Sequence, residues 1–400
     1  MTDQRPDQRV RVVVAPDKFK GSLPAADVAA AVAAGLHAER DDIDVACVPI
    51  ADGGDGTVDA AVAAGYQRVE VEAPGPTGQP LKAGYARRAE IGVFELAEVV
   101  GLNRLPGGTP APLTASTAGL GVMIRHALDR GCRHLVLALG GSASTDGGAG
   151  MIQALGGRLW GPSGEELPPG GAALVDLAAV DLDGLHPALA ASRVVVASDV
   201  ENPLLGPSGA AAVYGPQKGA SAGDIVLLER GLRRWADAVA GATGADLSGA
   251  AGAGAAGGTG FAALAVLHGE LHPGIDLVLD LVRFAEAVEG AALVVTGEGS
   301  LDEQSLQGKA PVGVARAAAR SGVPVVAVAG RCLLDEGDLE RAGIRAAYPL
   351  SALEPDLRRS MIDAAGLLER IGARIAHEWL PAGTARSPGR DAGGGGGGRA

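Results

Sequence analysis

Residues 10–22, VRVVVAPDKFKGS, contain the pattern that decides the fold, a short apolar run that leads into a polar loop. The run at residues 10–15 is rich in valine and short, so it predicts a strand buried on both faces, as in a parallel sheet. A helix is predicted next, from about residue 24 to 37. Strand, loop and helix in this order are typical of a βαβ unit.

The same order recurs along the chain. Strands are predicted for residues 43–50, 135–139, 193–197, 292–295 and 323–329. Each of the first four leads into a glycine-rich or polar loop. Helices are predicted after three of these loops, at about residues 58–64, after GGSASTDGGAG to about residue 155, and at about residues 310–320. Because ligands of parallel α/β sheets bind beyond the carboxyl ends of the strands, we expect these loops to form one shared site.

Residues 68–98 break this order, since polar and apolar residues alternate around PGPTGQP and predict two or three antiparallel strands. We therefore predict an α/β fold of two domains. Residues 9–68 plus 290–380 would form a Rossmann-like domain with a parallel sheet, and residues 69–289 an inserted α/β domain with a mixed sheet. Residues 381–400, which end in GGGGGGRA, predict a disordered glycine-rich tail. Residues 248–260, nearly all glycine and alanine, predict a mobile segment, a backbone-lined loop beside a ligand, or both.

Composition limits the function classes. The formal charge of −13 argues against nucleic acid or an anionic membrane surface as the main partner. The three cysteines are far apart, the histidines show no metal-binding spacing, and no apolar run is long enough to cross a bilayer. A cytoplasmic protein is expected. A homodimer is allowed for, although no residue pattern specifies the oligomeric state.

The use of lysine points to an anion. Only five of the 34 basic residues are lysine, and four of them stand in glycine- or acid-rich loops, at Lys18, Lys20, Lys218 and Lys309. Because an ammonium group is a compact point charge, it suits a tight anion site better than the wide guanidinium does. Phosphate is the most plausible anion, and a chance placement of lysines in polar loops is the alternative.

The first two loops supply cations, carboxylates and close-approach glycines. Lys18 and Lys20 would point to the same side of an extended backbone, while Ser22 is expected to cap the next helix or join the site. The loop ADGGDGT supplies Asp52, Gly53, Gly54 and Asp55. Asp55 could instead only favour the positive end of the helix that follows.

Two further loops supply hydroxyl, amide and carboxyl groups. In GGSASTDGGAG the candidates for an anion nest are Gly141, Ser142, Ser144 and Asp146. In SDVENPLLGPSG, Asp199 is expected to orient or deprotonate a substrate hydroxyl, and Asn202 to bind Mg²⁺ or substrate. Asn202 and the following proline could equally end the strand.

The last loop, TGEGSLDEQSLQGK, predicts the metal ligands. Glu298 and Asp302 are hard oxygen ligands of the kind that Mg²⁺ prefers, and Lys309 follows them. The alternative is that Lys309 only neutralises these acids as an ion pair. Lysines, carboxylates and glycine-rich amides around one cleft are the parts that phosphoryl transfer needs, with ATP as the donor.

Several well-known sites are absent from the sequence. It contains no GxxxxGK[ST] loop and no GxGxxG after the first strand. A phosphatase or mutase for a small sugar acid, and a non-catalytic module that binds a small carboxylate or a nucleotide, stay open as alternatives.

Taken together, the motifs PDKFKGS, ADGGDGT, GGSASTDGGAG, DVENPLLGPSGA, YGPQKGA, GAGAAGG and TGEGSLDEQSLQGK resemble the bacterial type I glycerate kinases. The likeness extends over about residues 12–372. It implies a two-domain α/β enzyme that transfers the γ-phosphoryl group of ATP to D-glycerate with Mg²⁺, and 2-phosphoglycerate as the commoner product. A kinase for a related small hydroxy acid is the nearest alternative. The chain has Asp55 where glutamate is expected, Ser300 where members often have arginine, Gln307 for histidine and Thr145 for asparagine.

Overall fold

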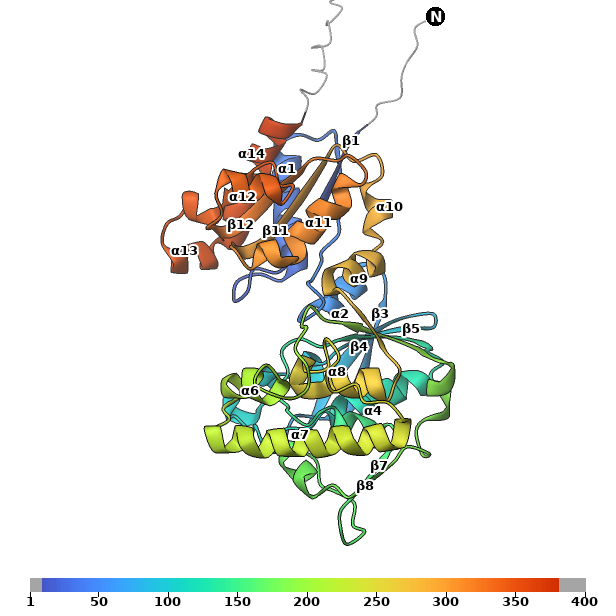
Figure 1. Ribbon diagram of the computed structural model, residues 1–400. Coiled ribbons are helices and arrows are strands. Elements are labelled where there is room, and N and C mark those ends of the chain that lie inside the picture. Colours follow the sequence, from blue (N-terminus) through green and yellow to red (C-terminus); the bar gives the residue numbers. More distant parts are fainter. Residues whose placement is uncertain (1–8, 381–400) are drawn as a thin grey trace, which may run out of the picture.

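The computed structural model describes residues 9–380, which form a five-stranded, a six-stranded and a two-stranded sheet with helices between the strands (Figure 1). The predicted tail at residues 381–400 lies outside the described residues. Within residues 9–380, no helix combines the length and the hydropathy that a membrane-spanning segment requires. The predicted α/β class, with one parallel and one mixed sheet, is confirmed.

The five-stranded sheet is parallel throughout, in the order β13-β12-β11-β1-β2. Its strands are β1 (Val10–Pro16), β2 (Ile43–Cys47), β11 (Leu293–Leu301), β12 (Val325–Cys332) and β13 (Ala347–Pro349). Val12 and Val14 of β1 pack into one core, and Val13 and Ala15 into another. Both faces of β1 are therefore covered, which explains its uninterrupted apolar sequence.

Helices cover both faces of this sheet. One face packs against α1 (Ala25–Glu39) and α14 (Ala364–Trp379), and the other against α9 (Gly274–Leu281), α10 (Phe284–Val288), α11 (Ala310–Ala319) and α12 (Glu336–Arg341). The short helix α13 (Leu357–Ile362) follows β13.

The start of α1 differs from the sequence-based expectation. Pro24 occupies the N-cap position, and no side chain caps this helix. Ser22 instead donates its hydroxyl group to the carbonyl oxygen of Met361 at 2.7 Å. Capping by Ser22 is therefore wrong, because the chain turns toward α13 before the helix begins.

The six-stranded sheet is mixed, in the order β10-β9-β6-β5-β4-β3. Its strands are β3 (Gln67–Pro74), β4 (Pro80–Arg88), β5 (Ile91–Glu95), β6 (His134–Ala138), β9 (Arg193–Ala197) and β10 (Glu270–His272). The pairs β3–β4 and β4–β5 are antiparallel, as the alternating pattern of residues 68–98 predicts, and the other pairs are parallel. The carboxyl ends of β5 and β6 point in the same direction.

One face of the mixed sheet carries the larger core. It packs against α3 (Ala97–Val100), α4 (Ala118–Asp129), α5 (Ala149–Ala154), α6 (Ala210–Tyr214), α7 (Ala222–Thr243) and α8 (Ala255–Ala265). The other face packs against α2 (Thr57–Ala63) and Leu281 of α9. The strands β7 (Arg158–Trp160) and β8 (Ala179–Asp181) pair separately. The domain limits at residues 69 and 289 stay a prediction, and α9 and α10 contribute to the core of the first sheet.

Residues 248–260 include backbone that packs against the loop following β6, and the predicted mobility or ligand contact of this segment stays a prediction. Gly257 has a φ of 66°, and a Cβ atom there would lie 2.0 Å from the carbonyl oxygen of Ser144. Glycine and alanine are needed here because two backbones meet with no room for side chains.

Candidate functional site

A cavity of about 800 Å³ opens at the carboxyl ends of strands from both large sheets. The first sheet contributes the segments after β1 and β2, the ends of β11 and β12, and α13. The second contributes Ala97 after β5 and Gly140 and Gly141 after β6. Ligand pockets commonly measure roughly 300–1,000 Å³, so this cavity has room for a nucleotide and a small second substrate.

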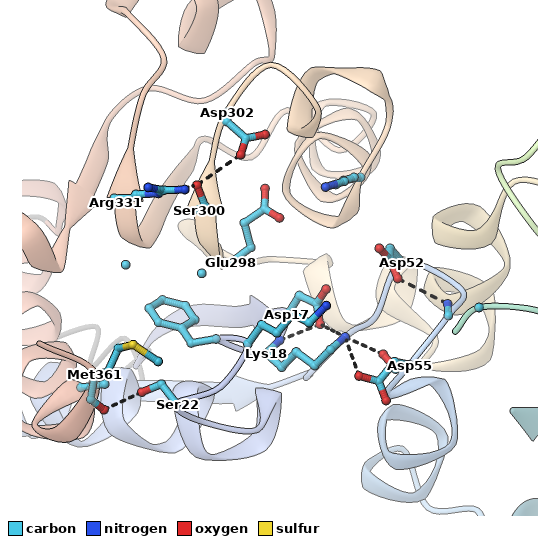
Figure 2. A pocket seen from close by; sticks show the side chains of 18 of the residues that line it. Asp17, Lys18, Ser22, Asp52, Asp55, Glu298, Ser300, Asp302, Arg331 and Met361 are labelled. Atoms are coloured by element: carbon cyan, nitrogen blue, oxygen red, sulfur yellow. Dashed lines mark hydrogen bonds and ion pairs between the residues drawn. The ribbon is translucent and has the colours of Figure 1, made fainter. Parts of the chain in front are cut away.

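Ten of the sequence-predicted site residues line this one cavity: Lys18, Lys20, Ser22, Asp52, Gly54, Asp55, Gly141, Glu298, Asp302 and Lys309. Figure 2 shows Met361 and Ser22 at one end, Asp52 and Asp55 at the other, and Asp17, Lys18 and Glu298 between them. Segments that are far apart in the sequence therefore bring lysines and carboxylates together.

Lys18 is held among carboxylates near the middle of the cavity. Its Nζ donates to the carbonyl oxygen of Asp55 at 2.6 Å and lies 3.5 Å from Asp17 Oδ1 and 3.8 Å from Asp55 Oδ2. Burial alone would lower the pKa of Lys18, but the combined attraction of the surrounding carboxylates, Asp17 first among them, outweighs burial and raises it. The ammonium group therefore stays charged at neutral pH and can bind an anion.

Two carboxyl groups that line the cavity hold their protons unusually strongly. Burial raises the pKa of Asp17 to about 6, with Lys18 opposing the shift and Asp52 adding to it. Burial likewise raises the pKa of Glu298 to about 7, against the Ser305 hydroxyl group and Lys309. Burial and mutual repulsion of this kind are typical of functional carboxylates.

Glu298 fits a divalent cation. Its Oε1 atom is buried and has no hydrogen-bond partner among the described residues, and the charges of Asp17 and Asp302 repel its carboxylate. In residues 9–380, no three His, Cys, Asp or Glu side chains form a metal cage of their own. Mg²⁺ needs no such cage, since one or two protein carboxylates plus phosphate oxygens and water satisfy it.

Asp302 and Lys309 belong to an ordered loop after β11. The Asp302 carboxylate accepts from the Ser300 hydroxyl group at 3.2 Å and from the Gln304 amide at 3.0 Å. Lys309 Nζ donates to Gln304 Oε1 at 3.2 Å. Lys309 makes no direct ion pair with Glu298 or Asp302, although its charge favours the ionised form of Glu298, and it lines the cavity. Part of the Asp302 bonding capacity is already used within the loop.

The loop after β6 presents its backbone, not its serines, to the cavity. Gly141 is exposed, whereas Ser142 and Ser144 are buried and hydrogen-bond to each other through their hydroxyl groups at 3.0 Å. Asp146 is fully buried and accepts from the Thr117 amide at 2.8 Å. These three side chains shape the loop from behind, so their predicted direct contact with an anion does not match their burial.

Asp199, Asn202 and Gly53 lie outside the cavity lining. Asp199 Oδ1 accepts from the Gly274 amide at 2.9 Å, and a Cβ atom at Gly53 would lie 2.4 Å from Gly274 Cα. The segment that links β2 to β3 therefore crosses the segment that links β10 to β11 at this point, with their backbones in contact. Burial raises the pKa of Asp199, and repulsion from Asp52 adds to the shift.

The amide of Asn202 is used within the protein. Its Nδ2 donates to the carbonyl oxygen of Ser208 at 2.8 Å, and its Oδ1 accepts from the Tyr214 hydroxyl group at 2.8 Å. The strand β9 ends at Ala197, so Asn202 does not end it, and the ligand role of Asn202 stays a prediction.

Fifteen residues that line the cavity were not among the sequence-predicted site residues, and three of them carry a charged or amide side chain: Asp17, Asn103 and Arg331. Asp17 stands directly after β1 and beside Lys18, a position that could have identified it. Asn103 and Arg331 gave no signal, since neither belongs to a glycine-rich loop after a predicted strand.

Comparison with known proteins gives consistent results. A family model described as "Glycerate kinase family" matches residues 12–380. A protein of Bacillus subtilis (strain 168) named glycerate kinase is 42% identical over 370 residues, covering 92% of this chain and 97% of that protein. An Escherichia coli (strain K12) protein named glycerate 2-kinase is 40% identical over 343 residues, covering 85% and 90%. A crystal structure described as a glycerate kinase 2 of Salmonella typhimurium LT2 superposes with a TM-score of 0.81 at 39% identity, covering 92% and 97%.

Proposed function

Because the chain belongs to the glycerate kinase family and is a kinase, we propose that it transfers the γ-phosphoryl group of ATP to D-glycerate with Mg²⁺. We propose 2-phospho-D-glycerate as the product in preference to 3-phospho-D-glycerate, since a 40% identical relative is named glycerate 2-kinase. The observation that carries the proposal is the convergence of Lys18, Lys309, Asp17 and Glu298 on one cavity.

Lysines and backbone groups would bind the anionic parts of both substrates. Lys18 keeps its charge among carboxylates and lies midway along the cavity, so it suits the transferring phosphoryl group. Lys20 and Lys309 also line the cavity and would bind neighbouring phosphate oxygens. The backbone at Gly140 approaches the Asp52–Asp55 segment, since a Cβ atom at Gly140 would lie 3.5 Å from the Asp55 nitrogen, and the exposed Gly141 beside it would face the second substrate.

Glu298 would hold Mg²⁺, with Asp302 directly or through water. When bound, the cation supplies positive charge that offsets the charge of the phosphate oxygens. The buried and unpartnered Oε1 atom of Glu298 supports this assignment.

Asp17 would accept the hydroxyl proton of glycerate. As the substrate oxygen forms its bond to the γ-phosphorus, the bond from that phosphorus to the bridging oxygen of ADP breaks, and the proton passes to the Asp17 carboxylate. A pKa of about 6 leaves Asp17 ionised at neutral pH and more basic than an ordinary carboxylate. Asp199 lies outside the cavity lining, so we propose that it positions the Asp52–Asp55 segment through Gly274.

The test is a coupled assay for ADP release with D-glycerate and Mg²⁺, each omitted in turn, followed by NMR of the product. ADP release that needs both, with phosphate on the 2-hydroxyl group, is the expected result. Release without glycerate would refute the kinase reaction with this acceptor, and a faster reaction with another hydroxy acid would move the proposal to that acceptor. The cytoplasmic location and a homodimer stay predictions.

A further inference from the structure

The two ends of the cavity differ in chemistry. At the α13 end it is lined by Phe19, Leu350, Leu357, Met361 and Ala364, which are apolar. At the other end, Asp52, Asp55 and the glycines after β6 line it. D-glycerate has only polar groups and a short carbon chain, whereas a nucleotide carries a flat base with apolar faces. The apolar end therefore suits the base of a nucleotide.

The apolar end is exposed and yet fixed in place. Leu357 is 66% exposed and Met361 38% exposed, although both are large apolar residues. The hydrogen bond from the Ser22 hydroxyl group to the Met361 carbonyl oxygen ties α13 to the loop after β1, and a Cβ atom at Gly21 would lie 3.3 Å from Met361 Cε. An exposed apolar surface held beside a polar cavity is typical of a ligand site.

A guanidinium group also lines the cavity, on the same side as Met361 (Figure 2). Arg331 is the β12 residue that pairs in register with Ser300 of β11, and its Nε donates to Ser300 Oγ at 3.1 Å. Ser300 in turn donates to Asp302. Ser300 is the only hydrogen-bond partner of the Arg331 side chain among the described residues, so the terminal nitrogens of the guanidinium are available to a ligand. From the family resemblance, arginine is expected at the position of Ser300. In this chain, Arg331 on the neighbouring strand supplies a guanidinium group beside that position.

We propose that the α13 end of the cavity is the nucleotide end, with the base against Leu357 and Met361 and the phosphates bound by Arg331. Ser300 is a positioning residue that orients the guanidinium. Glycerate then occupies the Asp52–Asp55 end, and the phosphates extend from Arg331 toward Lys18. The assignment rests on the proposed function in taking a nucleotide as the phosphoryl donor.

The first test separates nucleotide binding from turnover. Calorimetric titration of ADP without metal should show that Arg331→Ala weakens binding by about 10- to 100-fold, the range expected for a charge-assisted hydrogen bond. In the coupled assay the same variant should raise the KM for ATP while the KM for glycerate changes less than about twofold. Arg345→Ala is the matched control. Arg345 is an exposed arginine two residues before β13 of the same sheet, and it does not line the cavity.

An exchange variant tests the geometry of the pair. Because positions 300 and 331 face each other on adjacent strands, Ser300→Arg combined with Arg331→Ser places a guanidinium beside the same space. It should recover most of the ADP affinity that Arg331→Ala loses. An affinity as low as that of Arg331→Ala would overturn the role of the guanidinium.

A second pair of variants tests the base. Leu357→Glu should weaken ADP binding about tenfold or more, whereas Ile362→Glu should leave it unchanged, since Ile362 is 87% exposed on the same helix and does not line the cavity. Equal ADP affinities for these two variants and the wild type, with normal kinase activity in the wild type, would overturn the inference and leave the proposed function standing. A wild-type protein that does not phosphorylate glycerate would overturn the proposed function first.

Discussion

Replacing the buried Lys218 by methionine should make the stability of the fold less dependent on pH. The ammonium group of Lys218 is buried and donates to the carbonyl oxygen of Ser144, in the loop behind Gly141. Burial lowers the pKa of Lys218 from 10.5 to about 7, although the charge of Asp146 opposes the shift. Lys218 ends the short 3-10 helix Pro216–Lys218 and does not line the cavity.

The direction in which stability changes with pH follows from the number of protons bound by the folded and the unfolded chain. The unfolded chain keeps the Lys218 proton up to about pH 10.5, whereas the folded chain releases it above about pH 7. The unfolded state binds more protons between these values, so the free energy of unfolding rises with pH in this window. At about 1.4 kcal/mol per pH unit well inside the window, the rise from Lys218 is ~2 kcal/mol between pH 7 and pH 9.

The assay is urea unfolding of the wild type and Lys218→Met at both pH values. Loss of the hydrogen bond to Ser144 contributes about 1–3 kcal/mol of destabilisation that does not depend on pH. The informative quantity is therefore the change with pH in the free-energy difference between the two proteins. It should shift by ~2 kcal/mol in favour of the wild type at the higher pH. Lys82→Met, at an exposed lysine of β4, is the control and should show no such shift. A wild-type-to-variant difference that stays constant with pH would refute the reasoning.

Three further predictions concern the cavity and the crossing of the chain. Lys309→Ala should lower kcat by about 10²–10³ in the coupled assay if Lys309 stabilises the transition state, and near-native turnover would contradict this. Asp17 ionises above about pH 6, so kcat/KM should rise with pH through that value, and Asp17→Asn should lose both that rise and most activity. Gly274→Ala would put a Cβ atom 2.1 Å from the carbonyl oxygen of Asp52 and should destabilise the fold by about 1–3 kcal/mol. Gly241→Ala on α7 has open space around it and should be neutral or stabilising, and equal melting temperatures for the two variants would contradict the clash.

The strands and most of the cavity loops could be predicted from the sequence, because apolar runs and glycine-rich motifs are local patterns. Apolar runs such as residues 193–197 coincide with a strand, and the loops after β1, β2 and β11 line the cavity as predicted. The roles of single side chains were less accessible. Ser144 and Asp146 stand in a glycine-rich loop like that of an anion site, but the loop is covered by residues 248–260 and its side chains bond inward.

The sequence by itself determined the order of strands and helices, the two kinds of sheet and the loops after β1, β2 and β11 that line the cavity. Hydrophobic periodicity, glycine content and charge can each be read from a few neighbouring residues. Only the tertiary structure decided which charges face the cavity. It buried Lys218 under the Gly141 loop, and it placed Arg331 beside Ser300. Both outcomes depend on the packing of segments far apart in the chain, which sets desolvation and strand register, and neither quantity is encoded in a local pattern.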